Sequence, residues 1–197
     1  MSQSHPDSIA ELVADLGKLP GVGKKTATRY AYWLSGAEQE FLTNLAKKIH
    51  KIKHLIKICS ICGNKSESPI CPICQDPKRD IGQICVVEHS EDILQIERTE
   101  TYQGRYHVLG GVIDPLQKSG QAIHFDTLLQ RLEPEQVHEV ILACSPTIQG
   151  ETTMKALREL LHSHDLAVTQ LGRGLSMGAT IEYADKDTLK AAFGNRK

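Results

Sequence analysis

Four of the six cysteines fall into two close pairs, Cys59 with Cys62 and Cys71 with Cys74. Each Cys-x-x-Cys turn can place two thiolates side by side, and two such turns complete the tetrahedral sulfur set that Zn²⁺ prefers. Because four sulfur ligands leave no open coordination position, the spacing predicts one structural zinc ion per chain. Two disulfides or free redox thiols are the alternatives, and the reducing compartment expected of a chain without an export signal disfavours disulfides.

A second chemical signal is a glycine-rich turn between two helical patterns, with the sequence Leu-Pro-Gly-Val-Gly-Lys-Lys at residues 19–25. Its two glycines let the backbone turn sharply, so successive N–H groups can reach a phosphate at the start of the next helix. The helix dipole and nearby cations add positive charge at the same place. A connector that binds nothing is the alternative. The candidate phosphate-binding residues are Gly21, Gly23, Lys24, Lys25 and Arg29.

Two carboxylates stand where apolar runs give way to polar residues. Glu88 ends the run that begins at Cys85, and Glu151 follows the polar turn after residues 141–143. One or two lone carboxylates cannot easily hold the two-metal clamp that in-line chemistry at phosphate needs. We therefore expect no catalysis here, and we treat Glu88 and Glu151 as a partner-binding or vestigial acidic site.

Composition limits the class of protein. The 197 residues are 40% hydrophobic and 24% charged, which is enough to bury an ordinary core. No apolar run approaches the roughly 18 residues that span a bilayer, and residues 1–7 lack the apolar core of a signal peptide. We therefore expect a cytoplasmic protein.

The net charge of −1 conceals a division along the chain. Residues 1–80 carry 12 Lys and Arg against 8 Asp and Glu, whereas residues 81–197 carry 11 against 16. Such asymmetry suggests a polyanion as partner of the N-terminal part. A basic, solvated helix face is the alternative explanation.

Hydrophobic periodicity predicts the elements that position these residues. The spacing indicates three helices within residues 8–58, the first opened by a capping box of Ser8 and Glu11. From residue 84 onward, short apolar runs alternate with amphipathic stretches, which predicts an α/β layer with a mainly parallel sheet. A short strand at residues 181–183 and a helix at 185–193 follow as a tail.

The motifs resemble known families. The glycine turn resembles helix-hairpin-helix proteins, which implies sequence-independent binding to the DNA backbone. The runs ending at Glu88 and Ala143 resemble the Toprim fold, with Ser145 and Thr147 where its catalytic members carry aspartates. The glycine turn, the four cysteines, the Toprim-like runs and the tail follow one another in the order found in the RecR family of bacterial recombination mediators. The chain resembles this family over nearly its whole length, and the Tyr-x-Gly-x-Tyr-His-Val-Leu-x-Gly motif of residues 102–111 is a further match.

This resemblance implies partners and an assembly. A member of the family is expected to form a homo-oligomer, a dimer or a tetrameric ring, around DNA. It would act in DNA repair with RecO, and in many bacteria with RecF, to load RecA onto single strands covered by single-strand-binding protein. The segment 114–122 departs from the family pattern.

We therefore expect a multi-part α+β chain. Its predicted parts are a helix-hairpin-helix DNA-binding module (1–58), a four-cysteine zinc finger (59–74), an α/β Toprim domain (81–175) and a C-terminal strand-helix tail used in oligomer contacts (176–197). A Mg²⁺-dependent Toprim-type nuclease and a zinc-bearing interaction protein without DNA contact are the alternative functions.

Several reactive or aromatic residues are better explained by packing. Cys85 and Cys144 lie in or beside apolar runs and are predicted to be small buried hydrophobes. His107 is expected to pack beside a strand. Tyr30 and Trp33 share a helix with apolar neighbours, and we expect them in the core rather than stacked on bases.

Overall fold

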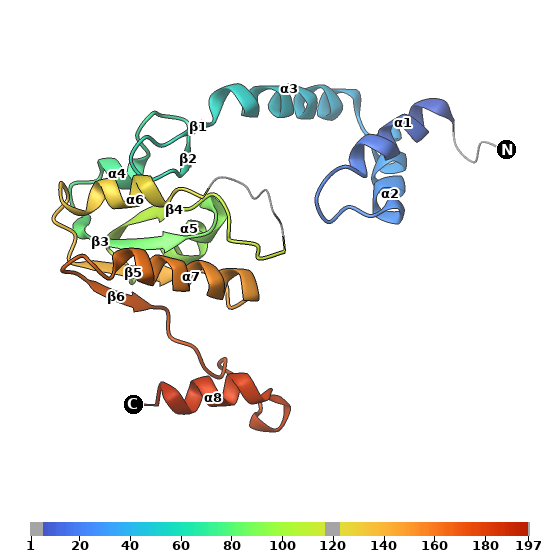
Figure 1. The fold of residues 1–197 in the computed structure, drawn as a ribbon. Helices are drawn as coiled ribbons and strands as arrows, with labels where there is room; N and C mark the ends of the chain where they lie inside the picture. Colours follow the sequence, from blue (N-terminus) through green and yellow to red (C-terminus); the bar gives the residue numbers. More distant parts are fainter. Residues whose placement is uncertain (1–5, 117–122, 197) are drawn as a thin grey trace. The chain divides into compact units, whose positions relative to one another are not determined.

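The computed structural model describes residues 6–116 and 123–196, so residues 117–122 of the divergent segment lie outside it (Figure 1). The chain divides into two compact units, Met1–Leu55 and Ile56–Lys197, which are described separately. Within the described ranges, no helix combines the length and apolar character that crossing a membrane requires.

The first unit consists of three helices: α1 (Asp7–Leu16), α2 (Lys24–Ser35) and α3 (Gln39–Leu55). The predicted capping box is wrong, because α1 already begins at Asp7 and its N-cap residue is Pro6, without a side-chain cap. Helix α3 ends before the predicted Ile58, because residues 57–58 form a strand instead. The predicted existence and order of the three helices are confirmed.

The aromatic residues of the first unit lie at its surface. Trp33 is 62% exposed and Tyr30 is 43% exposed in the single chain, so the prediction that both lie in its core is wrong. Only the small side chains Ala27 and Ala31 are buried on α2, because three short helices cannot enclose large rings. Trp33 instead packs edge-on against Phe41 of α3, with ring centroids 5.5 Å apart.

The second unit is built on a parallel sheet of four strands in the order β4-β3-β5-β6. In the central strand, Cys85 is in register with Tyr106 on one side and with Ile141 on the other. Helices connect the parallel strands, which confirms the predicted α/β layer. The elements are β3 (Asp80–Val87), α5 (Ser90–Glu97), β4 (Gly104–Val108), α6 (Phe125–Leu132), β5 (Glu139–Ala143), α7 (Ile148–Leu161) and β6 (Ala167–Gln170).

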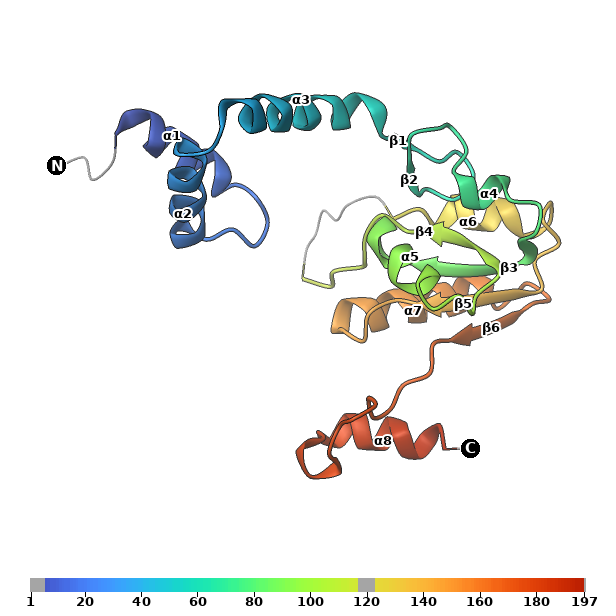
Figure 2. The same ribbon diagram turned by 180° about the vertical axis from the view of Figure 1, so that it is seen from behind.

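Both faces of this sheet are covered, as the alternation of residues along β3 requires. Ile84 and Val86 face the larger core, which α6 and α7 close. Cys85 and Val87 face the opposite core, which α5 closes with Ile93. Figure 2 shows α5 in front of the sheet, whereas Figure 1 shows α6 and α7 in front. Cys85 is thus a buried small side chain, as predicted.

His107 is fully buried in β4, beside a buried arginine of α6. Its Nε2 lies 2.7 Å from the carbonyl oxygen of His124 and must donate, because a carbonyl only accepts. Nδ1 then accepts from the Arg131 guanidinium at 3.4 Å. Burial lowers the pKa of His107 from 6.5 to about 4. The imidazole is therefore neutral in the folded chain at physiological pH.

The depressed pKa of His107 predicts an acid-sensitive stability. Between pH 6.5 and about 4 the unfolded imidazole takes up a proton that the folded one does not, so protonation favours unfolding. The free energy of unfolding should fall by about 1.4 kcal/mol per pH unit in this window on account of His107. Denaturant titrations of His107→Gln, which keeps a donor for His124, should lose this part of the slope. Equal slopes in both proteins would contradict the assignment.

In the tail, the described residues 176–196 form a helix but no strand. The predicted strand at residues 181–183 is wrong: Ile181–Tyr183 is a 3₁₀ turn, closed by a hydrogen bond from Tyr183 N to Thr180 O at 3.1 Å. Apolar alternation alone does not make a strand, since a strand needs a neighbour to pair with. The predicted last helix is confirmed as α8 (Lys186–Gly194), whose N-cap Asp185 accepts from the amides of residues 187 and 188.

Candidate nucleic-acid interface and metal centre

The turn between α1 and α2 presents backbone amides to solvent. Gly21 has a φ of 75°, a left-handed conformation that glycine adopts without strain. A Cβ atom on Gly21 or Gly23 would meet nothing within 4 Å, so a ligand can approach the backbone closely. Gly23 is the N-cap of α2 and has no side chain to satisfy the amides of the first turn. These amides are therefore available to an acceptor such as phosphate.

Cations surround this turn. Lys24 and Lys25 form the exposed start of α2, and Arg29 lies exposed about one turn further along. The Arg29 guanidinium lies over the ring of Tyr30, 5.5 Å from its centre. Lys18 is engaged by Asp15 at 2.7 Å, which raises the pKa of the lysine through their hydrogen bond. Helix α3 adds four exposed lysines to the same unit: Lys47, Lys48, Lys51 and Lys53.

The four paired cysteines meet in a knob at the start of the second unit, which we call the cysteine knob (residues 57–76). Strands β1 (Lys57–Ile58) and β2 (Lys65–Ser66) form a hairpin that carries the first pair. The short helix α4 (Pro72–Gln75) carries the second pair, with Cys71 at its N-cap. All four sulfur atoms lie within 4.8 Å of one another and are buried.

The dimensions of this cluster fit a tetrahedral metal ion. Zinc bonded to four sulfurs at about 2.3 Å needs sulfur–sulfur distances of about 3.8 Å. Cys62 Sγ and Cys71 Sγ are 3.6 Å apart, and the Cys71 amide donates to Cys59 Sγ at 3.3 Å. The hydrogen bond between the two thiols lowers the pKa of Cys71 and raises that of Cys62, so it favours the metal-binding thiolate form at Cys71 alone. The four cysteines can therefore hold a metal ion.

At the carboxyl end of the sheet, the Glu88 side chain accepts hydrogen bonds from the uncharged amide and hydroxyl groups of Ser145. Glu88 Oε1 accepts from the Ser145 amide at 2.7 Å, and Oε2 accepts from the Ser145 hydroxyl at 3.2 Å. Thr147 caps α7 by accepting from the Gly150 amide. A Cβ on Gly150 would lie 2.0 Å from the Ser145 carbonyl oxygen, so only glycine fits this close approach.

The second candidate carboxylate is also engaged. Glu151 pairs with Arg173, 2.5 Å away, on the segment that follows β6. In the part of the chain that the structure describes, the four cysteines are the only group of three or more side chains placed to share a metal ion. The carboxyl edge therefore does not present a carboxylate cluster that could hold two metal ions.

Similarity to known proteins extends over nearly the whole chain. Family models match residues 9–53 (RecR, helix-hairpin-helix), residues 82–172 (Toprim domain) and residues 174–197 (RecR, C-terminal). The recombination protein RecR of Bifidobacterium longum subsp. infantis is 43% identical over 198 residues, covering 100% of this chain and 99% of the relative. This chain belongs to the RecR family. The recombination protein RecR of Lactococcus lactis subsp. lactis is 44% identical over 193 residues, covering 98% of both chains.

Membership in the RecR family confirms the resemblance that the motifs indicated. It places the chain among proteins of DNA recombination and repair. The helix-hairpin-helix match spans the turn with its glycines and lysines, and the Toprim match spans the sheet and Glu88.

Two side-chain contacts of this RecR-family chain could not be predicted in atomic detail from the sequence. Glu88 and Ser145 are 57 positions apart, and only the parallel pairing of β3 with β5 brings them together. Arg173 was not among the candidate site residues, although it neutralises Glu151. The adjacent ends of parallel strands predict that residues 88 and 145 are neighbours, but not which of their atoms bond.

Proposed function

We propose that this RecR-family chain is a non-enzymatic DNA-binding mediator of recombinational repair. The observation that carries the proposal is the open start of α2, where the first turn has no side-chain cap and lies between the unobstructed Gly21 and Gly23 and the exposed Lys24 and Lys25. Amides and lysines at this position grip the phosphate backbone and read no bases, so binding is independent of sequence. Arg29 adds a further phosphate contact, and the lysines of α3 contribute less.

We further propose that the ion in the cysteine knob is zinc, one per chain, and that its role is structural. The sulfur-only donor set supports zinc over Mg²⁺ or Ca²⁺, which prefer oxygen. The closed coordination leaves no position for a substrate. The proposed zinc finger covers residues 59–74.

The acidic edge of the Toprim domain is proposed as a contact for protein partners. Glu88 and Glu151 are already satisfied by Ser145 and Arg173, which supports a binding role over catalysis. By family, the partners are RecO and, in many bacteria, RecF, and the task is to load RecA onto single strands covered by single-strand-binding protein. This work belongs in the cytoplasm.

A ring of several copies is the proposed working form. A single hairpin contacts few phosphates, whereas several hairpins in one ring gain from a high effective concentration. The first unit supports association, because α1, α2 and α3 line an apolar groove of about 380 Å³. The tail 176–197 supports it as well, because four large apolar side chains there are exposed: Met177, Ile181, Tyr183 and Phe193.

Salt-dependent DNA binding by the full chain tests this function. Mixed-sequence single- and double-stranded oligonucleotides should bind with an affinity that does not depend on sequence and falls steeply as salt is raised. A plot of log affinity against log salt should have a slope of magnitude about 2 or more. A folded, metal-loaded chain that ignores both kinds of DNA in dilute buffer would show that the proposal is wrong.

A further inference from the structure

The cysteine knob is joined to the edge of the Toprim sheet. The Val108 amide of edge strand β4 donates to the carbonyl oxygen of Cys62 at 2.8 Å. A Cβ on Gly63 would lie 3.0 Å from the Val108 carbonyl oxygen, and the φ of 75° at Gly63 also favours glycine. Ile73 of α4 packs against both the cysteines and the core under α5. The knob is therefore bonded to and packed against the edge of the sheet at β4 and is not a separate appendage.

The knob also holds the first turn of α5. The Lys65 amide of β2 donates to Ser90 Oγ at 3.0 Å, and Lys65 Nζ pairs with Glu91 at 3.0 Å. Ser90 is the first residue of α5. The Lys65–Glu91 pair is exposed and contributes little by itself, but the backbone bond fixes β2 against the helix.

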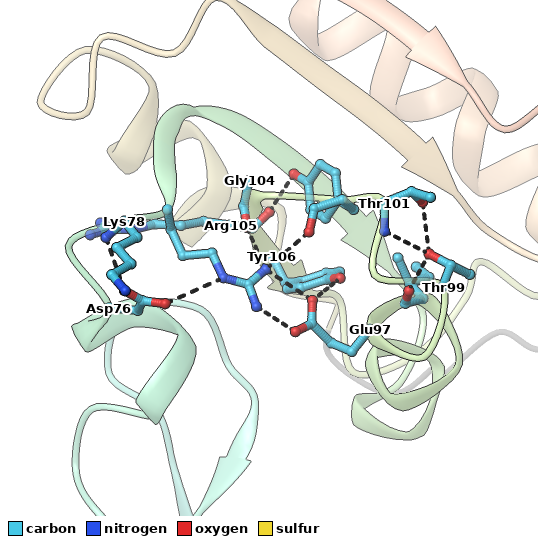
Figure 3. A network of polar contacts seen from close by, with 11 residues as sticks. Asp76, Lys78, Glu97, Thr99, Thr101, Gly104, Arg105 and Tyr106 are labelled. Carbon is cyan, nitrogen blue, oxygen red and sulfur yellow. Dashed lines mark hydrogen bonds and ion pairs between the residues drawn. The ribbon is translucent and has the colours of Figure 1, made fainter.

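The last turn of α5, at Glu97, is held by the segment that follows the knob (Figure 3). Arg79 lies three residues beyond the end of the knob and donates two hydrogen bonds to the Glu97 carboxylate, one of them at 2.9 Å, and others to the carbonyl oxygens of Tyr102 and Gly104. Its Nε lies 4.0 Å from Asp76, and Tyr106 Oη donates to Glu97 at 2.6 Å. The Arg79 side chain is only 13% exposed, and its hydrogen bond lowers the pKa of Glu97. A partly buried, bidentate pair of this kind is specific in its geometry.

Helix α5 begins two residues after Glu88. Between them, the His89 amide donates to the Asp92 carboxylate at 2.8 Å, which fixes the residue after Glu88 to the first turn of α5. A shift of α5 therefore moves the Glu88 backbone. The same shift changes the hydrogen bond from the Ser145 amide to Glu88. The exchange rate of the Ser145 amide therefore reports a displacement of Glu88.

We propose that the metal-bound cysteine knob positions α5 at both ends, and through α5 the Glu88 carboxylate, with Arg79 as the main positioning residue. This rests on the proposed function only in assigning partner binding to the acidic edge. Loss of the metal then disables that edge while the helix-hairpin-helix unit, which is compact by itself, still binds DNA. Coupling is reciprocal, so loosening α5 also weakens metal binding.

Hydrogen exchange followed by NMR tests the coupling on the full chain. The zinc-loaded chain is compared with the same chain after a chelator has removed the metal. Amides of α5, β4 and Ser145 should exchange about tenfold faster or more without metal, while those of α7 should stay within about twofold. Unchanged exchange in α5 and at Ser145, or a uniform loss of protection over residues 56–197, would overturn the proposal.

Variants of Arg79 test the reverse direction without removing a cysteine. In equilibrium competition with a chromophoric chelator, Arg79→Met should release zinc at about tenfold lower chelator concentration than the wild type, and Arg79→Lys should recover part of the difference. Arg158→Met is the matched control, because Arg158 lies on α7 and bonds to Gln170 instead of to α5. If Arg79 only stabilised the helix, zinc release would be unchanged. That result would contradict the assignment of Arg79 as the positioning residue between the knob and α5.

These measurements separate the inference from the proposed function. DNA binding is measured on the same zinc-loaded and zinc-free samples. Failure of the zinc-loaded chain to bind DNA would reject the proposed function and leave the exchange result intact. Equal loss of DNA binding and of α5 protection on metal removal would instead contradict the claim that the two units act independently.

Discussion

Reversing the charge of the hairpin, by Lys24→Glu with Lys25→Glu, should weaken DNA binding by about a hundredfold at about 0.1 M salt. Each lysine that neutralises a phosphate releases counterions, and at this salt concentration that release contributes nearly tenfold in affinity. The substitutions remove two such contacts per hairpin and add repulsion. The slope of log affinity against log salt should also fall, for each hairpin that contacts the DNA, by about 1.4 for single strands or about 1.8 for duplex DNA. Fluorescence anisotropy over a salt series measures both quantities.

A matched variant distinguishes the hairpin from net charge. Lys78 and Lys155 are exposed lysines of the second unit outside the tail 176–197, one shortly before β3 and the other on α7. Lys78→Glu with Lys155→Glu changes the net charge of the chain by the same amount, so long-range repulsion alone would weaken binding equally in both variants. We expect the control to stay within about threefold of the wild type. An unchanged slope in the hairpin variant would move the DNA contact elsewhere, with the lysines of α3 next in order.

Most of the site features that could be predicted depend on residues close together in the sequence. The two Cys-x-x-Cys pairs are short-range signals, since each turn needs only its own residues to place two sulfurs, and the cysteines do meet. The glycine turn is similar, because the φ of Gly21 and the helix start at Lys24 are set within a few residues. The parallel sheet followed from apolar runs that alternate with amphipathic helices.

Features that depend on distant parts of the chain could not be predicted in the same way. Helical periodicity shows that Trp33 belongs to an apolar face, but not whether this chain or another molecule covers that face. The prediction of a strand at residues 181–183 was wrong because alternation of apolar and polar residues does not reveal whether a neighbouring strand is there to pair with. The contacts of Arg79 and Glu97 span 18 positions and depend on how the knob sits against α5.

Cys71→Ser should abolish metal binding and lower the melting temperature of the chain by about 10 °C. Serine does not supply a thiolate, so the remaining three sulfurs hold the ion weakly. Without the ion the knob loses its hold on β4 and α5. Exposure of Ile73, loss of the bond between Val108 and Cys62, and loosening of the Arg79–Glu97 pair together cost about 4 kcal/mol. Metal analysis of the purified chain and calorimetry provide the two readouts.

Cys85→Ser is the control that makes this prediction specific. Cys85 is as buried as the ligands, at 2% exposure, and it undergoes the same chemical change, but it lies in the sheet core under α5. Its replacement buries a hydroxyl group at a cost of about 1 to 2 kcal/mol and should leave one zinc per chain. Equal loss of metal from both variants would mean that any destabilisation of the fold releases the ion, and would contradict the specific role of the Cys71 thiolate. A metal-free but equally stable Cys71→Ser chain would mean that the ion does not hold the knob to the sheet.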